Sequence, residues 1–476
     1  MLPNKETQAV SGTRRILRSG SYLGLANLYN FIVRSVYVVV FARVLGIEQY
    51  GAYVYAQSWY LVAIAIASWG TGELAMAERA RLGPDRGNSI LGSGLTLRLC
   101  LSLAATLAVS ACAVLFEAQP HLQLLILIYA HAALTRGLAN YFAFLFITHE
   151  NSRVWCYISV IFQTVEIVLA ISLALSGTGL VAIAIVQCAV WWALLLTCWT
   201  IHNRLHPSLE LGGTWRHWPA LLRNGAALGL ATLVFSSLGY GLLIFYRYFI
   251  VSPRQLGEAA FAIQLVLMLG QAIKVISNAA ITPLSEPGTA RHRRQGLFFT
   301  TVWSQSLLLG GAFYFTCNML MPPVVSLVVG PEFRDSADLL ARFSWLLIPL
   351  PIIFGIRVML ISINRVRGFL LAMLVGLLVV LIQMAGLTLQ SAVNLDSVLA
   401  ALGSGYLAIT SVGLAQLWRS PVSLSIGEML YPLALFAGCA AFYLLLHDSG
   451  PVMVPAACLV SLLLASALQL RSLRNR

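Results

Sequence analysis

Seven basic residues lie within segments of the sequence that are otherwise strongly apolar. They are Arg34, Arg98, Arg136, Arg247, Lys274, Arg342 and Arg357. If these segments cross a membrane, a charge at mid-depth costs about 2.5–3.5 kcal/mol by insertion scales, and such residues point to function by default. Guanidinium groups form charge-assisted, often bidentate hydrogen bonds with phosphate. The pattern therefore favours a polar cavity that holds an anion.

Position along the apolar segments separates these seven residues. Arg34, Arg136 and Lys274 are more than a turn or two from either end, and a polar cavity is the cheaper explanation for them. The residues near segment ends can instead extend to the headgroups. The alternative for each central residue is pairing with carbonyls or a carboxylate of a neighbouring helix. We expect the cavity to be lined by Arg34, Arg98, Arg136, Arg247, Lys274 and Arg357.

Two further features within apolar segments suggest movement or coupling. Glu166, in "FQTVEIVLA", is the one carboxylate well inside such a segment. It is a candidate to carry a coupling proton or bind sodium, or to be the static partner of Arg34, Arg98 or Arg136. Pro349 and Pro351 lie in another segment, where proline frees carbonyls and kinks a helix. They are candidates for a hinge or for a static kink.

The elements that must position these residues are transmembrane helices. Hydrophobic residues make up 59% of the 476 residues and charged residues 10%, against about 45–50% and 25% in soluble domains. Segments of about 20 apolar residues without period-2 alternation indicate helices rather than a barrel. We predict an all-α membrane protein with fourteen spans, at 21–42, 52–72, 90–116, 122–147, 154–176, 179–201, 222–250, 257–281, 296–320, 339–362, 366–390, 396–417, 426–446 and 450–470.

The distribution of basic residues predicts the orientation. With both termini in the cytoplasm, cytoplasmic segments hold 20 of the 30 Arg and Lys residues and outer segments hold three. This asymmetry follows the positive-inside rule and requires an even number of spans. The net charge of +13 is thus spread over cytoplasmic loops, and the sequence offers no patch for nucleic acid.

An internal repeat suggests two lobes. "GSYLGLANL" (20–28) opens the first span and "GAALGLATL" (225–233) opens the seventh, with six of nine positions identical. A duplication after six spans gives parallel repeats, and chance similarity is the alternative. We therefore expect a six-helix lobe at 1–201, a cytoplasmic linker at 202–220, a second six-helix lobe at 221–418, and two additional helices with a basic tail at 419–476.

Two short motifs resemble a known family. "ARVLGIEQYGAYVYAQSW" (42–59) resembles the first outer loop of the polysaccharide transporter family, the O-antigen or oligosaccharide flippases, with an R-x-LG-x-x-x-(Y/F)-G pattern. "VVGPEFRDSADLLARFSWLLIPLP" (328–351) resembles the loop before that family's tenth span. The family belongs to an exporter superfamily that also contains multidrug and toxin extrusion transporters and lipid II flippases.

The resemblance implies a fold, a cargo and a location. It implies two six-helix lobes around a central cavity that work by alternating access. The implied cargo is a polyprenyl-pyrophosphate-linked oligosaccharide, turned from the cytoplasmic to the outer leaflet of the bacterial inner membrane for O-antigen, capsule or exopolysaccharide assembly. A polysaccharide polymerase and chain-length proteins are expected partners besides the lipid bilayer. No cofactor is expected, although coupling to a proton or sodium gradient is open.

Two other functions compete with this interpretation. A cation-coupled multidrug exporter would need acidic residues at mid-span, whereas this sequence offers mainly basic ones. A membrane polysaccharide polymerase or ligase would need a large outer loop with catalytic residues, and no predicted outer segment is long enough. We do not expect an enzyme, because the eight histidines form no HExxH or triad pattern and the sequence contains no nucleotide-binding motif.

Overall fold

The computed structural model describes residues 5–82, 84–206, 214–249, 252–279, 284, 291–390, 393–420, 422, 426–446 and 453–474. Throughout these ranges the chain forms helices and short connections, with no strand. It divides into two compact units. The first comprises Met1–Leu45 and Ala52–Ile244, and the second comprises Gly46–Gly51 and Phe245–Arg476. Each is described by itself below.

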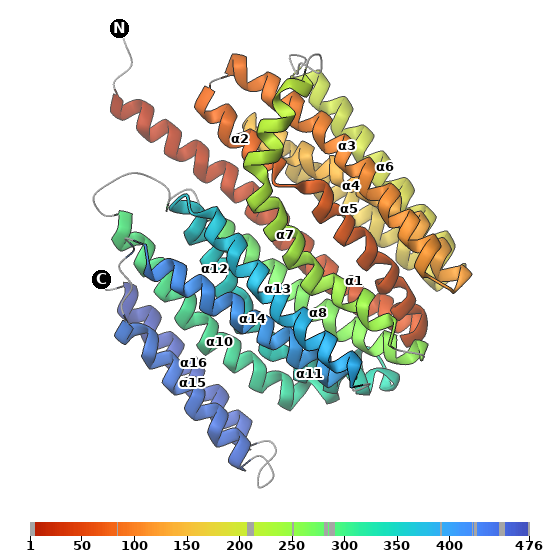
Figure 1. Ribbon diagram of the computed structural model, residues 1–476, viewed down its shortest axis with the longest axis vertical. Helices are drawn as coiled ribbons and strands as arrows, with labels where there is room; N and C mark the ends of the chain where they lie inside the picture. Colours follow the sequence, from red (N-terminus) through yellow and green to blue (C-terminus); the bar gives the residue numbers. More distant parts are fainter. Residues whose placement is uncertain are drawn as a thin grey trace. The chain divides into compact units, whose positions relative to one another are not determined.

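Within the described residues, the first unit is built from seven α-helices and a 3-10 turn (Figure 1). They are α1 (Lys5–Ser68), α2 (Thr71–Leu82), α3 (Pro84–Phe116), α4 (Pro120–Thr148), α5 (Ser152–Leu175), α6 (Leu180–Leu205), η1 (Thr214–His217) and α7 (Trp218–Arg247). Within this unit α3 packs along α4, and α4 and α5 both pack against α6. The short helix α2, which the hydropathy pattern does not reveal, packs against α3.

The second unit also consists of helices within the described residues. They are α8 (Pro253–Ala279), α10 (Arg291–Val328), η2 (Pro331–Phe333), α11 (Arg334–Phe343), η3 (Ser344–Leu347), α12 (Pro349–Ser362), α13 (Val366–Leu389), α14 (Leu395–Trp418), α15 (Ile426–Leu446) and α16 (Met453–Arg474). The longest pairings are those of α13 with α14 and of α10 with α16. The last two helices lie side by side along α10 (Figure 1).

The predicted membrane spans fall on these helices. Ten described stretches are long and apolar enough to cross a bilayer. The first of them, Leu25–Met76, contains two predicted spans, and α8, α15 and α16 coincide with three more. The prediction of an all-α polytopic membrane protein is therefore confirmed: the chain is a multi-pass membrane protein.

The segment between the first two predicted spans is not a loop. α1 continues through it, with a single non-helical residue, Gly46, at φ 74° and ψ 167°. Glycine adopts this left-handed backbone without a Cβ clash, so one residue suffices to bend the helix. The short stretch Gly46–Gly51, which begins at the bend, belongs to the second unit. There Tyr50 is buried and donates its hydroxyl to Gln264 Oε1 at 2.9 Å.

The tenth predicted span also differs from expectation. A sequence proposed as one helix at 339–362 is divided into α11, the 3-10 turn η3, and α12. Pro349 is the first residue of α12, and Pro351 follows within the first turn. Proline there removes no intrahelical hydrogen bond, because the first amides have no carbonyl partner. The prolines thus begin a helix and do not kink the middle of one.

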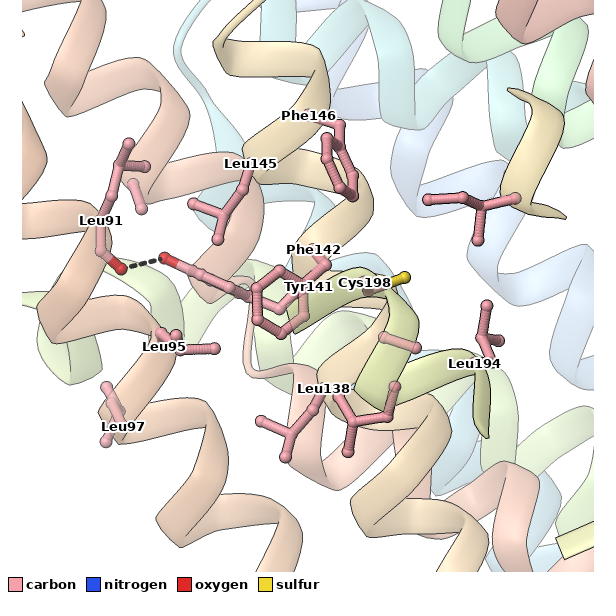
Figure 2. Packing of buried hydrophobic residues seen from close by; sticks show 14 of the residues in the cluster. Leu91, Leu95, Leu97, Leu138, Tyr141, Phe142, Leu145, Phe146, Leu194 and Cys198 are labelled. Atoms are coloured by element: carbon pink, nitrogen blue, oxygen red, sulfur yellow. Dashed lines mark hydrogen bonds between the residues drawn. The ribbon is translucent and has the colours of Figure 1, made fainter. Parts of the chain in front are cut away.

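The core of the first unit is close-packed around α4. Tyr141 donates its buried hydroxyl to the Leu91 carbonyl at 2.8 Å, and Phe142, Leu145 and Phe146 pack beside it (Figure 2). A Cβ on Gly94 would lie 2.1 Å from the Tyr141 hydroxyl, so glycine at that position makes room for the ring. This packing fixes how α4 is rotated about its own axis. It therefore also fixes the direction in which the polar side chains of α4 point.

Candidate functional site

Three of the sequence-predicted residues come together in the first unit. Arg136 on α4 and Glu166 on α5 lie 4.0 Å apart, from Nη2 to Oε2. Arg34 on α1 interacts electrostatically with the same Glu166 carboxylate. At a rise of 1.5 Å per residue, Arg34 lies about 18 Å along α1 from Gly46, and Arg136 lies about 18 Å along α4 from Thr148. Glu166 lies about 21 Å along α5 from Ser152. They therefore lie deep in their spans, where headgroups are out of reach.

An aromatic ring and partial exposure define the setting of Arg136. Its guanidinium lies over the Trp191 ring, 5.0 Å from the centroid. Its side chain is 20% exposed, whereas that of Glu166 is 10% exposed. A cation over an indole face is stabilised by the ring quadrupole. Trp191 and Glu166 thus hold Arg136 in place while part of the cation stays accessible.

A hydrogen-bonded network of tyrosines and glutamines adjoins these charges. Gln187 on α6 donates to Tyr53 at 3.1 Å and accepts from Tyr129 at 2.6 Å. The hydroxyls of Tyr37 and Tyr53 are 2.9 Å apart, and Gln57 also donates to Tyr53. These side chains are buried, so the network links α1, α4 and α6 through satisfied polar groups.

The cluster can hold an anion. Arg136 pairs with Glu166 and Arg34 interacts electrostatically with the same carboxylate, so these three residues together carry one unbalanced positive charge. Guanidinium groups offer several fixed N–H donors to phosphate oxygens, and hydroxyls and amides beside them can bond sugar hydroxyls. Sequence reasoning missed Gln57, Gln187 and the tyrosines. Their signal is amide and phenol side chains in segments that are otherwise apolar.

Arg98 has a different environment in the same unit. It is 3% exposed, and its Nε donates to the Gly137 carbonyl on α4 at 3.2 Å. Its electrostatic partners are Glu73 and Tyr141. These contacts favour the alternative in which an intramembrane arginine locks two helices together.

The remaining predicted residues belong to the second unit or its boundary. Arg357 on α12 is 8% exposed, and Arg247 occupies the last turn of α7. Arg342 pairs with Asp396, from Nη1 to Oδ1 at 2.8 Å, in an exposed position. The side chain of Lys274 lies outside the described residues. The structure therefore brings together Arg34, Arg136 and Glu166.

A second polar cluster lies at the end of α4 and α6. The rings of His149 and His206 stack with centroids 4.0 Å apart, and His202 contacts both from a fully buried position. Burial lowers the pKa of His149 from 6.5 to about 4, and burial together with Arg79 lowers the pKa of His206. The imidazoles of His149 and His206 are therefore neutral at pH 7.

This cluster predicts an acid-sensitive fold. A histidine whose pKa is depressed on folding contributes stability that is present above pH 6.5 and is lost as the pH falls to about 4. We expect acidification across this window to cost about 1–2 kcal/mol for His149, since the half-exposed ring keeps part of its hydration. Melting temperatures in detergent between pH 7.5 and 4.5 measure this. A His149→Gln variant should show a flatter profile, and an unchanged slope would contradict the assignment.

Comparison with known proteins identifies the family of this chain. The sequence profile of a family described as "Polysaccharide biosynthesis protein" matches residues 16–286, more than half of the chain. The chain belongs to this family. Among curated protein sequences, none matches significantly.

Solved transporter structures share the fold. The lipid II flippase MurJ in its inward closed conformation matches with a TM-score of 0.69 at 13% identity, over 95% of this chain and 99% of that chain. The eukaryotic MATE transporter AtDTX14 matches with a TM-score of 0.56 at 12% identity, over 90% and 99%. An inward-facing multidrug resistance MATE transporter of the MOP superfamily matches at 0.55 and 13% identity, over 87% and 95%. At these identities the likeness establishes the fold.

Proposed function

We propose that the protein is a flippase for a polyprenyl-pyrophosphate-linked oligosaccharide, which it moves from the cytoplasmic to the outer leaflet of the bacterial inner membrane. The observation that carries the proposal is the net positive cluster of Arg34, Arg136 and Glu166 deep within the spans of a polysaccharide biosynthesis family member. The MurJ fold, named for a lipid II flippase, supports a lipid-linked cargo.

In this proposal each group in the cluster has a role. The pyrophosphate, which cannot cross about 30 Å of hydrocarbon unaided, exchanges its hydration for hydrogen bonds from Arg34 and Arg136. Glu166 and Trp191 orient Arg136, and the tyrosines and glutamines nearby offer partners to the sugars. The polyprenyl chain stays in the lipid while the headgroup passes through the protein.

Transport by alternating access requires exposure of the cluster to one side at a time. Pro349 and Pro351, at the beginning of α12 after a 3-10 turn, remain hinge candidates. Glu166 remains a candidate for proton or sodium coupling, although its contact with Arg136 favours a static role. Arg247, Lys274 and Arg357 remain proposed contributors to a cationic path, whereas the contacts of Arg98 favour a structural role. A polymerase and chain-length proteins would use the delivered repeat unit.

Drug export is the alternative within the same fold. A cationic drug would be repelled by a cluster with one unbalanced positive charge, and Glu166, the one carboxylate that the described residues contribute to it, already interacts with Arg34 and Arg136. The balance of charge therefore favours an anionic cargo.

Deletion of the gene tests the proposed function in cells. We expect the polyprenyl-linked repeat unit to accumulate in the cytoplasmic leaflet and the surface polysaccharide to be lost. The leaflet distribution can be measured with a membrane-impermeant reagent that oxidises exposed sugars in spheroplasts. Normal polymer in a strain without a second flippase would overturn the proposal.

A further inference from the structure

A polar pocket with a volume of about 390 Å³ lies at one end of the first unit, away from the Arg136 cluster. It is lined by Arg79, Asn88, Thr148, His149, Glu150 and His206. Arg79 follows a span that ends near Met76, Thr148 ends α4, and His206 follows α6. The pocket thus lies at the level of the headgroups, on the side where basic residues predominate.

The structure positions Arg79 closely in this pocket. Its Nη1 donates to the Thr148 carbonyl, and its Nε is buried with no hydrogen-bond partner. A Cβ on Gly87 would lie 2.4 Å from Arg79 Cγ, so glycine at that position leaves the space that the arginine stem occupies. An unsatisfied buried N–H on a cation is costly and favours an acceptor from a ligand.

The two imidazoles that line the pocket are neutral donors or acceptors and carry no charge. The His149 Nδ1 is 2.8 Å from the Leu145 carbonyl, so this nitrogen carries the proton. Asn151 Nδ2 donates to His206 Nε2 at 2.7 Å, which leaves Nδ1–H of His206 as a donor. Of the lining residues that the structure describes, the charged ones are therefore Arg79 and Glu150, which interact electrostatically.

We propose that this pocket binds a zwitterionic phosphoethanolamine headgroup of a membrane lipid. Among the described residues, the lining carries one positive and one negative charge, which matches a phosphodiester joined to an ammonium group and disfavours a purely anionic ligand. Arg79 and the Nδ1–H of His206 bind the phosphate, whereas His149, whose one N–H is donated to the Leu145 carbonyl, contributes no donor. Glu150 accepts hydrogen bonds from the ammonium, which a trimethylammonium group cannot donate. The acyl chains remain in the adjacent bilayer, because the lining residues lie at span ends.

Binding of short-chain lipids to the purified full-length protein in detergent tests this site. Dihexanoyl phosphatidylethanolamine, phosphatidylcholine and phosphatidylglycerol are titrated and binding is followed by native mass spectrometry. We expect phosphatidylethanolamine to bind at least fivefold more tightly than phosphatidylcholine or phosphatidylglycerol. Equal binding of all three, or tighter binding of phosphatidylglycerol, would overturn the proposal.

Variants assign the preference to the two charges. Glu150→Gln keeps the contact of Arg79 with Thr148 and should abolish the preference for phosphatidylethanolamine over phosphatidylcholine. Arg79→Gln should weaken binding of both lipids. Arg204→Gln, which removes an exposed basic residue near His206, is the matched control and should bind as the wild type does. A preference that survives Glu150→Gln would contradict the site. None of these measurements depends on the translocated cargo.

Discussion

Arg136→Gln is expected to lower the translocation rate per folded molecule by about tenfold to a hundredfold. The substitution removes a charge-assisted hydrogen bond to the pyrophosphate, worth about 1.5–3 kcal/mol. Glutamine keeps a polar, hydrogen-bonding side chain, but it is shorter than arginine and lacks the guanidinium that lies over Trp191. Arg136→Lys should restore part of the rate, because it returns the charge without the bidentate geometry. Rates of leaflet exchange in proteoliposomes, divided by the amount of folded protein, measure the effect.

Arg98→Gln provides the matched control for this prediction. Arg98 is also an arginine in an apolar span, but its Nε bonds to the Gly137 carbonyl and its side chain is buried. We expect this variant to lower the melting temperature and the yield while the rate per folded molecule stays within about twofold of the wild type. Equal losses of rate in both variants would mean that position in the span, and not the Glu166 cluster, decides function.

Gly257→Ala is expected to destabilise the second unit by about 1–3 kcal/mol, the usual range for overpacking. A Cβ at this position would lie 2.0 Å from the Ile47 carbonyl oxygen, and a Cβ on Gly51 would lie 2.6 Å from the Gly257 Cα and N. Both neighbours are backbone atoms, so rotation of a side chain cannot relieve the clash. The change should appear as a lower melting temperature in detergent and an earlier loss of monodisperse protein on heating.

Gly270→Ala on the same helix separates this clash from the general effect of a methyl group. A Cβ there would lie 3.4 Å from Leu350 Cδ1, which is an ordinary contact with the end of a flexible side chain. Alanine is also favoured over glycine in a helix by about 0.5–1 kcal/mol. We expect an unchanged or higher melting temperature. If Gly257→Ala behaves in the same way, the close approach of the two backbones is wrong.

The sequence predicts the fold well because lipid imposes one simple requirement. Each span must satisfy its own backbone hydrogen bonds, so a run of about 20 apolar residues identifies a helix. Hydropathy is misleading around Gly46, because a few polar residues between two apolar segments are typical of a loop. Only the backbone shows that α1 continues with one residue at positive φ. The short helix α2 carries too many charges to be recognised by hydropathy.

The candidate site is only partly predictable for a similar reason. Arg98 and Arg136 look alike in sequence, and their difference depends on which groups of neighbouring helices lie nearby. Arg98 donates to the carbonyl of Gly137. Arg136 instead contacts the carboxylate of Glu166 and the indole of Trp191. These partners are remote in sequence, and hydropathy contains no information about helix rotation. The pairing of Arg136 with Glu166 was one of several open alternatives.

Leaflet exchange in proteoliposomes tests the central claim most directly. The purified protein is reconstituted with a short polyprenyl-pyrophosphate-linked disaccharide, and an impermeant reagent reports how fast the inner-leaflet lipid becomes accessible. We expect the wild-type protein to accelerate exchange and Arg136→Gln to remove most of this acceleration. Wild-type vesicles that exchange this lipid no faster than protein-free vesicles, yet transport a cationic dye, would contradict the account.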